Sequence, residues 1–189
     1  NLIDTAWLEK IEENIIHSGI KIYEHRQVQI DIFLKNLREI EKYFKIPFKV
    51  NIKIDDKFFH EKISIDKYKD SLKKNRDIDK LVGGTKIGPH KSDFTFFVDR
   101  NYFASQLSTG QQKTLVLLLY LSQCNHFVSV HKIKPILLLD EINSHLDDMN
   151  TALLLKIVDQ FDMQVFMTGT KKESFSFLST NTNFCNISK

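Results

Sequence analysis

Two adjacent carboxylates, Asp140 and Glu141, directly follow a short run of apolar residues at positions 136–139. Such a run is typical of a strand buried on both faces of a parallel sheet, and ligands bind at the carboxyl edge of such sheets. One carboxylate at that edge can hold Mg²⁺ beside nucleotide phosphates. The next one points elsewhere and can orient or deprotonate an attacking water. A strand that ends in a solvated acidic turn is the alternative interpretation of this segment taken alone.

A second candidate site is the sequence Leu-Ser-Thr-Gly-Gln-Gln-Lys at residues 107–113, just before a predicted helix. Ser108 or Thr109 can cap the start of that helix, and Gly110 lets the backbone approach a ligand closely. The amino terminus of a helix is a ready anion site. A capped helix start without a ligand is the alternative.

Two further segments lie near these in the sequence. Residues 143–147, Asn-Ser-His-Leu-Asp, come just after the carboxylates and include Asp147. A predicted strand at residues 163–168 ends on a hydroxyl residue, Thr168.

The first forty residues predict a long helix that Pro47 ends. Ile30, Phe33, Leu37 and Ile40 recur three and four apart, which places them on one helical stripe. The spacing is compatible with pairing to another long helix or with a single amphipathic helix on a globular core.

Hydrophobic patterning predicts the remaining elements. Alternation indicates strands at residues 48–54 and 94–98, the second with one face well buried. Between them lie a charged helix at residues 61–81, with Ile65, Tyr68 and Leu72 as its apolar stripe, and a glycine-rich loop at 83–89. Helices at 111–127 and 152–161 then alternate with strands at 135–139 and 163–168, and 184–187 is a candidate third strand. This rhythm indicates α/β organisation.

Composition narrows the class of protein. The 189 residues are 42% hydrophobic and 27% charged, which is ordinary for a globular chain and argues against a disordered tail or a fibrous repeat. No apolar run approaches the ~18 residues of a membrane span, and no signal peptide is evident. Cys124 and Cys185 lack metal spacing and predict reduced thiols in a cytoplasmic protein. The chain begins with Asn1, so we expect a piece of a longer protein.

The basic charge lies in the first half of the chain. Residues 1–91 carry 19 basic and 15 acidic side chains, whereas residues 92–189 carry 8 and 9. Lys73, Lys74, Arg76 and Lys80 cluster before the glycine-rich loop and are the candidate contacts to DNA phosphates. A solvated helical surface is the alternative.

Together, the four segments resemble the ABC-type ATPases. Residues 107–111 resemble the signature motif of that superfamily, Asp140 and Glu141 its Walker B motif, and residues 144–147 its D-loop. Thr168 stands where many members carry a switch histidine. The resemblance implies an α/β fold with parallel strands that forms the carboxy-terminal lobe of an ATPase head, preceded by a long-helix domain.

Within that superfamily the chain is most similar to the RecF family of bacterial recombination mediators. Residues 88–93, Gly-Pro-His-Lys-Ser-Asp, are similar to a Gly-Pro-His-Arg-x-Asp segment of that family, with Lys91 in place of arginine. The family often has Asp-Asp where this chain has Asp140 and Glu141. No Gly-x-x-x-x-Gly-Lys-Ser/Thr P-loop is present in the sequence. The resemblance therefore implies a carboxy-terminal portion, with a helical arm at residues 1–80 and an ATPase lobe at residues 81–189.

The resemblance also implies a function and its residues. The intact protein is expected to be a slow ATPase and an ATP-dependent DNA clamp in replication, gap repair and the SOS response, whereas this portion alone is expected to be inactive. ATP is expected between two subunits of a homodimer, with Asp140 on Mg²⁺ and Glu141 positioning water. The nucleotide-binding residues implied are Ser108, Thr109, Gly110, Gln111, Asp140, Asp147 and Thr168. Expected partners are gapped, single-stranded and duplex DNA, and mediators of the RecO and RecR type, with no membrane.

Two other interpretations remain open from the sequence. The chain could come from the head of another SMC-like ATPase, although the Gly-Pro-His segment argues against this. It could also be a non-catalytic scaffold that keeps the fold and lacks the P-loop.

Overall fold

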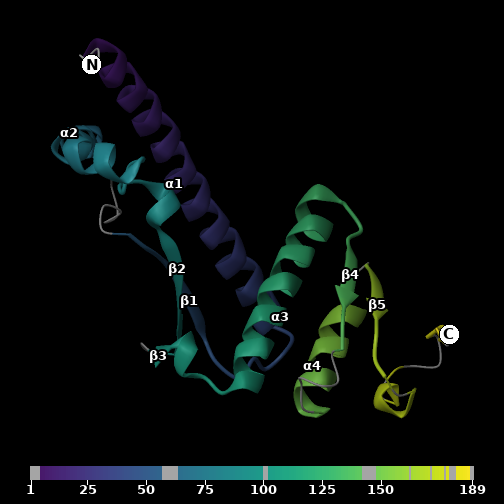
Figure 1. Ribbon diagram of the computed structural model, residues 1–189. Helices are drawn as coiled ribbons and strands as arrows, with labels where there is room; N and C mark the ends of the chain where they lie inside the picture. The colour runs from purple at the N-terminus through teal and green to yellow at the C-terminus, as the bar shows by residue number, and fades with distance from the viewer. Residues whose placement is uncertain are drawn as a thin grey trace. The chain divides into compact units, whose positions relative to one another are not determined.

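The computed structural model of the protein describes residues 5–56, 64–99, 102–141, 148–161, 163–170, 172–176, 178 and 182–187. Contacts divide the chain into two compact units (Figure 1). Unit 1 comprises residues 1–32 and 48–103, and unit 2 comprises residues 33–47 and 104–189. The helices and strands are α1 (Thr5–Glu41), β1 (Val50–Asp55), α2 (Ile65–Val82), β2 (Asp93–Val98), β3 (Tyr102–Phe103), α3 (Thr109–His126), β4 (Ile136–Leu139), α4 (Asp148–Asp159) and β5 (Gln164–Met167).

Unit 1 contains a small antiparallel sheet in the order β1-β2-β3. The register pairs Ile52 with Phe96 and Val50 with Val98, so these apolar side chains share one face of the sheet. Ile52 and Val98 are buried, which confirms the alternating pattern of the first predicted strand. Lys53 lies on the opposite face, with its ammonium 5.2 Å from the ring centroid of Phe97.

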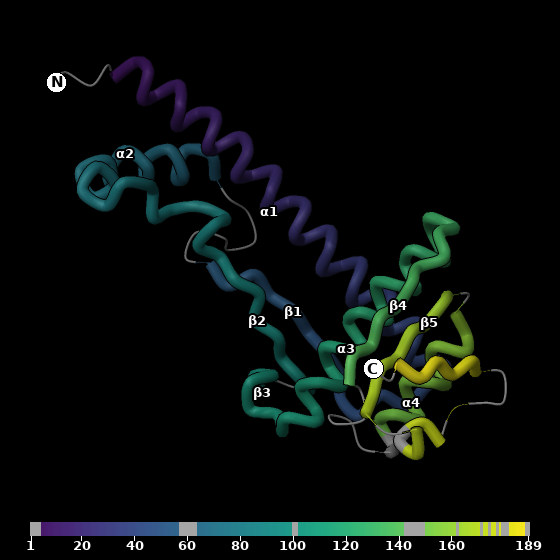
Figure 2. Tube along the Cα trace, turned by 45° about the vertical axis from the view of Figure 1, so that its right-hand side comes forward, coloured from purple at the N-terminus to yellow at the C-terminus, as the bar shows by residue number. Residues whose placement is uncertain are grey.

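The same unit packs α2 against the first part of α1, and the two helices lie side by side in Figures 1 and 2. Ile16 of α1 and Tyr68 and Leu72 of α2 form a buried cluster with Ile87. Ser64 caps the start of α2, and Gly83 ends it in a left-handed conformation with φ 80°. The predicted second helix and its glycine-rich boundary are thereby confirmed.

Tyr68 occupies a tight site that two glycines make possible. A Cβ added to Gly19 would lie 2.9 Å from the Tyr68 hydroxyl oxygen, and one added to Gly88 would lie 2.6 Å from it. Gly88 also has φ 132°, a conformation that side chains rarely adopt. Burial, and then the nearby charge of Asp56, raises the pKa of Tyr68. Among the described residues its hydroxyl has no hydrogen-bond partner.

Unit 2 pairs β4 and β5 as parallel strands, with Leu137 opposite Val165 and Leu139 opposite Met167. Leu118 and Leu121 of α3 and Leu154 and Ile157 of α4 are buried side chains of this unit. The parallel strand pair and its two helices confirm the mixed α/β organisation predicted for the second half.

The end of α1 belongs to unit 2 and is fixed to α3 by hydrogen bonds. The Ser122 hydroxyl donates to the Phe33 carbonyl at 2.9 Å, and the Asn125 amide donates to the Asn36 side chain at 2.9 Å. Ser122 is fully buried, so its hydroxyl needs this partner. Polar contacts as well as the apolar stripe therefore hold the last turns of α1.

The prediction that the first strand of unit 2 is buried on both faces is wrong for this chain. Ile136 and Leu138 are 61% and 72% exposed, and Phe166 of β5 is 52% exposed. Only two strands pair in the described part of this sheet, and Ile136 and Leu138 share a face because side chains alternate along a strand. The apolar composition of the strand indicated that burial of both faces would be favourable. It could not indicate whether other elements of the described chain cover both faces.

Other details of the prediction also differ. The long helix ends at Glu41, before Pro47, and residues 182–187 are described without a strand. Ile65, the first residue of α2, is 60% exposed, so of the predicted apolar stripe only Tyr68 and Leu72 are buried. Phe94 is 38% exposed, so the second strand of unit 1 is less buried than its pattern indicated.

The predicted boundary at residues 80 and 81 differs from the division into compact units, because α1 contributes residues to both units. The assignment of an arm and an ATPase lobe stays a prediction. None of the described helices is apolar over a length sufficient to cross a bilayer.

We expect Gly88→Ala to destabilise this chain by about 3 kcal/mol, because it combines an unfavourable φ with a clash against Tyr68. Gly84→Ala is the matched control, since a Cβ there meets nothing within 4 Å. Urea denaturation followed by circular dichroism measures both variants. Equal stability of the two variants would contradict the packing described for Tyr68.

Candidate nucleotide site

The carboxyl ends of β4 and β5 bring together three residues that the sequence singled out. Asp140 and Glu141 follow β4, and Thr168 follows β5. The Thr168 hydroxyl donates to Asp140 Oδ1, and the Glu141 backbone amide donates to the Thr168 hydroxyl at 3.1 Å. All three residues are exposed, so this hydrogen-bonded group faces solvent at the edge where α/β sheets bind ligands.

The backbone has a defined conformation where β4 ends and the two carboxylate residues begin. The ladder continues past the strands, because the Thr168 amide donates to the Leu139 carbonyl at 2.9 Å. Glu141 then turns into the left-handed region with φ 45°. A residue with a Cβ rarely adopts this conformation. Glu141 therefore leaves the extended conformation of the strand directly after Asp140.

The second predicted site, the start of α3, forms a complete capping box. The Ser108 hydroxyl accepts from the Gln111 amide at 3.4 Å, and the Gln111 side chain accepts from the Ser108 amide at 3.1 Å. Ser108, Thr109 and Gln111 are exposed. The predicted capping role of Ser108 is thereby confirmed, and the helix start is accessible from solvent.

Gly110 lies in the first turn of α3, where its own packing does not require glycine. A Cβ built on Gly110 meets nothing within 4 Å, and its φ is not in the left-handed region. Its carbonyl accepts from the buried Thr114 hydroxyl at 2.9 Å. The space above Gly110 is therefore open to a group from outside this unit.

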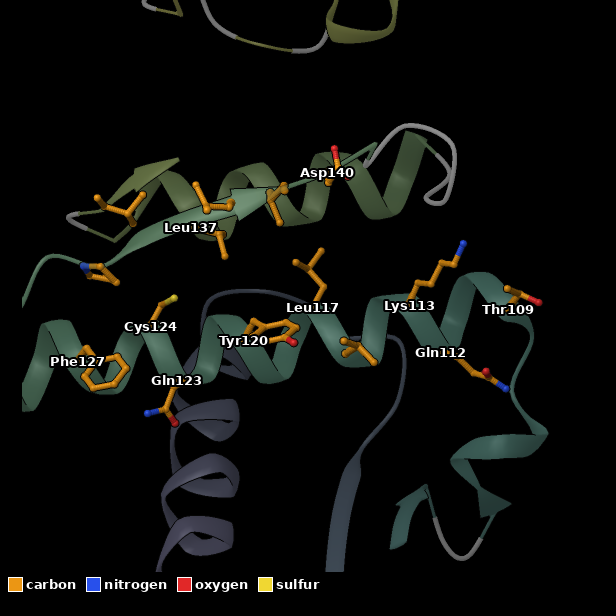
Figure 3. Close-up of a pocket in the computed structure, with 15 residues that line it drawn as sticks. Thr109, Gln112, Lys113, Leu117, Tyr120, Gln123, Cys124, Phe127, Leu137 and Asp140 are labelled. Carbon is orange, nitrogen blue, oxygen red and sulfur yellow. The ribbon is translucent and has the colours of Figure 1, made fainter. Parts of the chain in front are cut away.

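A groove of about 820 Å³ runs between α3 and β4, and Figure 3 shows the side chains that line it. Most of its lining is apolar, including Leu117 and Leu137. Thr109, Lys113 and Asp140 lie at one end of the groove (Figure 3). The sequence had assigned no role to Lys113, which lines the groove together with Thr109 and Asp140 of the two motif segments. The remaining lining residues are Gln112, Val116, Tyr120, Gln123, Cys124, Phe127, Pro135, Ile136, Leu138 and Leu139.

The donor set at Asp140 is of the kind that Mg²⁺ uses beside a nucleotide. Among the residues that the structure describes, no three His, Cys, Asp or Glu side chains are placed to hold a metal ion. Mg²⁺ bound with ATP needs only one or two protein carboxylates, because phosphates and water complete its coordination. The exposed Asp140 carboxylate, oriented by a hydroxyl, fits that requirement. Asp147 and the predicted D-loop at residues 144–147 lie outside the described residues.

The four predicted DNA contacts differ in their surroundings within unit 1. Arg76 forms two hydrogen bonds of 2.7 Å to the carboxylate of Glu12, which is only 6% exposed. Lys73 lies 3.4 Å from Glu9 in a second ion pair. Lys74 and Lys80 are exposed. The structure therefore assigns Lys73 and Arg76 a role in joining α2 to α1, and leaves DNA contact by the cluster a prediction.

The Gly-Pro-His segment is fixed by contacts inside unit 1. Arg26 of α1 donates to the Pro89 carbonyl at 2.6 Å and to the Ser92 hydroxyl, and its guanidinium lies over the Phe94 ring. The His90 ring bonds to the Thr85 carbonyl at 2.8 Å, which indicates that Nε2 carries a proton. The sequence did not point to Arg26, because its partners lie more than sixty residues away.

Comparison with known proteins shows what the chain is similar to. No protein-family model matches the chain. The chain is 32% identical over 170 residues to the DNA replication and repair protein RecF of Rickettsia bellii (strain OSU 85-389), covering 88% of the chain and 47% of that protein. It is 31% identical over 180 residues to RecF of Rickettsia peacockii (strain Rustic), covering 94% of the chain and 50% of that protein.

Solved structures agree in fold. The recombination mediator protein RecF-ATP of the RecFOR pathway superposes with a TM-score of 0.70 at 24% identity, over 89% of this chain and 46% of the other. The ATPγS complex of RecF gives a TM-score of 0.71 at 23% identity, over 92% and 47%. The chain spans about half the length of the relatives that it matches. In both sequence and fold, the chain is therefore similar to RecF over about half of that protein's length.

Proposed function

We propose that this chain is the carboxy-terminal part of a RecF-like, ATP-dependent DNA-binding protein that acts in DNA replication and repair. Its contribution is half of a composite ATP site: a signature motif at the start of α3, and a Walker B pair after β4. The observation that carries the proposal is the end of the β4–β5 pair, where Asp140 and Glu141 emerge together beside Thr168.

Each residue has a role that its surroundings support. Asp140 holds Mg²⁺, since its carboxylate is exposed and already oriented. The bound ion would neutralise phosphate charge. Glu141, which is exposed and follows Asp140 with a left-handed backbone, orients water for attack on the γ-phosphate. Its carboxylate needs no metal contact of its own for this.

The start of α3 serves a second subunit. Its first turn presents backbone amides and the helix dipole to an anion. The open space above Gly110 lets a phosphate approach the backbone without meeting a side chain. We infer that Ser108, Thr109, Gly110 and Gln111 contact the γ-phosphate of ATP held by a partner copy, so that ATP joins two subunits into a dimer.

The groove between α3 and β4 supports a further part of the site. Parallel strands are normally covered on both faces, yet Ile136 and Leu138 are exposed beside this groove. Its matched relatives are about twice as long as this chain. We infer that a segment present in RecF-length proteins, carrying the P-loop, covers these side chains and supplies the phosphate-binding amides.

We assign DNA contact to basic side chains of unit 1 for which the structure describes no ion pair between α1 and α2. Lys74 and Lys80 meet this description, whereas Lys73 and Arg76 neutralise Glu9 and Glu12. Contacts of lysine with phosphate carry no sequence information, which suits a protein that acts at gaps of any sequence. ATP-dependent dimerisation would close such contacts around DNA, and slow hydrolysis would release it. RecO- and RecR-type mediators are the further partners that we propose.

We expect Glu141→Gln in a RecF-length protein to reduce ATP turnover by about 10²- to 10⁴-fold, the range for loss of a general base. The substitution keeps the backbone bond to Thr168, so nucleotide binding should persist and the ATP-bound dimer should last longer. Phosphate release and sedimentation velocity measure the two effects. Glu173→Gln, another exposed glutamate, is the matched control. Unchanged turnover in Glu141→Gln would show that Glu141 does not position the water.

We expect Ser108→Asp to block ATP-dependent dimerisation while preserving the fold. Aspartate is as good a helix cap as serine, but its charge repels a phosphate at the same position. Sedimentation velocity with and without ATP measures dimerisation, and nucleotide titration of the monomer should be unchanged. Ser108→Thr, a neutral cap, is the control. A Ser108→Asp protein that dimerises normally would overturn the role in trans.

We expect Lys74→Ala combined with Lys80→Ala to lower the slope of log affinity against log salt by about 1.8 on duplex DNA, since each phosphate contact contributes about 0.9. The loss should be equal for every DNA sequence. Lys10→Ala combined with Lys42→Ala removes the same charge from lysines held in ion pairs with Glu13 and Glu39. An identical slope in the two double variants would mean that α2 does not contact DNA.

A further inference from the structure

The Thr168 hydroxyl already makes two hydrogen bonds within this chain. It donates its only proton to Asp140 Oδ1 and accepts the Glu141 amide at 3.1 Å. A threonine hydroxyl has one donor and two acceptor lone pairs. After these bonds, only one acceptor position remains.

This arrangement bears on the nucleotide-binding role that the family resemblance implies for Thr168, in which its hydroxyl would sense the γ-phosphate. Phosphate oxygens are acceptors and are recognised by donors. The Thr168 hydroxyl cannot donate to a phosphate while its proton is shared with Asp140. Its remaining lone pair and a phosphate oxygen are both acceptors, so no hydrogen bond could form between them.

The Thr168 backbone is also fixed. Its amide donates to the Leu139 carbonyl at 2.9 Å, directly after the pairing of Leu139 with Met167. The hydroxyl is thus held at a defined place beside the residues that follow β4. Glu141 in turn has a left-handed backbone with φ 45°, which is unfavourable for a residue with a Cβ. A hydrogen bond to its amide offsets part of that cost.

We propose that Thr168 is a positioning residue, which orients the Asp140 carboxylate and holds the Glu141 backbone turn, and not a sensor that contacts the γ-phosphate. The proposal rests on the proposed function for its consequence in ATP hydrolysis. The two hydrogen bonds themselves belong to this chain without nucleotide. The structural and functional parts can therefore be tested separately.

The first experiment measures amide hydrogen exchange by NMR on this chain alone. Thr168→Val removes the hydroxyl with little change in shape, and exchange of the Glu141 amide should become about threefold to tenfold faster. Thr168→Ser should restore slow exchange. Thr170→Val, a nearby exposed threonine, is the control. The amide of residue 168 reports on strand pairing, and should exchange as slowly in Thr168→Val as in the parent.

Equal exchange of the Glu141 amide in Thr168→Val and the parent chain would overturn the proposal. So would faster exchange at residues 141 and 168 together that Thr168→Ser does not reverse, because that pattern reports loss of strand pairing and not of the hydroxyl bond.

The second experiment uses a RecF-length protein that binds ATP. A positioning role predicts that Thr168→Val raises the Mg²⁺ concentration for half-maximal turnover about threefold to tenfold, while the ratio of ATP to ADP affinity stays the same. Thr168→Ser should return the Mg²⁺ requirement to the parent value. A lower ATP to ADP ratio with an unchanged Mg²⁺ requirement would establish the sensor role instead. Absence of ATP binding in the parent protein would refute the proposed function, and leave the exchange result to decide the positioning of Glu141.

Discussion

Parallel pairing of β4 with β5 is the constraint on which the candidate site depends. Asp140 and Thr168 are 28 positions apart in the sequence, and only the alignment of the two strand ends makes them neighbours. A shift of one residue would move Thr168 away from both carboxylates and reverse the faces of the β5 side chains. The apolar residues of the strands thus set the register, and the register sets the geometry of the polar group.

Unit 1 depends on a different kind of contact. Tyr68 fits between two glycines, and Arg76 neutralises a glutamate that is almost fully buried. Both contacts join α2 to α1. The Tyr68 contact requires a partner without a side chain, and the Arg76 contact requires a partner of opposite charge. Arg26 adds a third contact by holding the Gly-Pro-His segment to α1. The segment most characteristic of the family resemblance is therefore, in this chain, a packing element of unit 1.

Much of the fold could be predicted because its signals are local. Periodicity predicted α1 and α2, alternation predicted β1, and Ser108 predicted the start of α3. The exposure of Ile136 could not be predicted, since it depends on which strands and helices lie over the sheet. Arg76 shows the same limit: its charge is visible in the sequence, but its partner, Glu12, is 64 positions away. Thr168 was identified by position, whereas the direction of its hydroxyl bonds required the paired strands.

The capping box at the start of α3 would compete with a ligand for the anion site proposed there. Ser108 and Gln111 satisfy each other when no ligand is present, so an arriving phosphate must exchange with them and does not simply fill vacant donors. Such a cap contributes about 1 kcal/mol, or roughly a fivefold change in an equilibrium constant. Small anions that reach only one amide gain too little to displace it. In the proposed dimer, a triphosphate held by a second subunit would have its other contacts to offset this exchange. The helix start would then favour a ligand that is already bound firmly elsewhere.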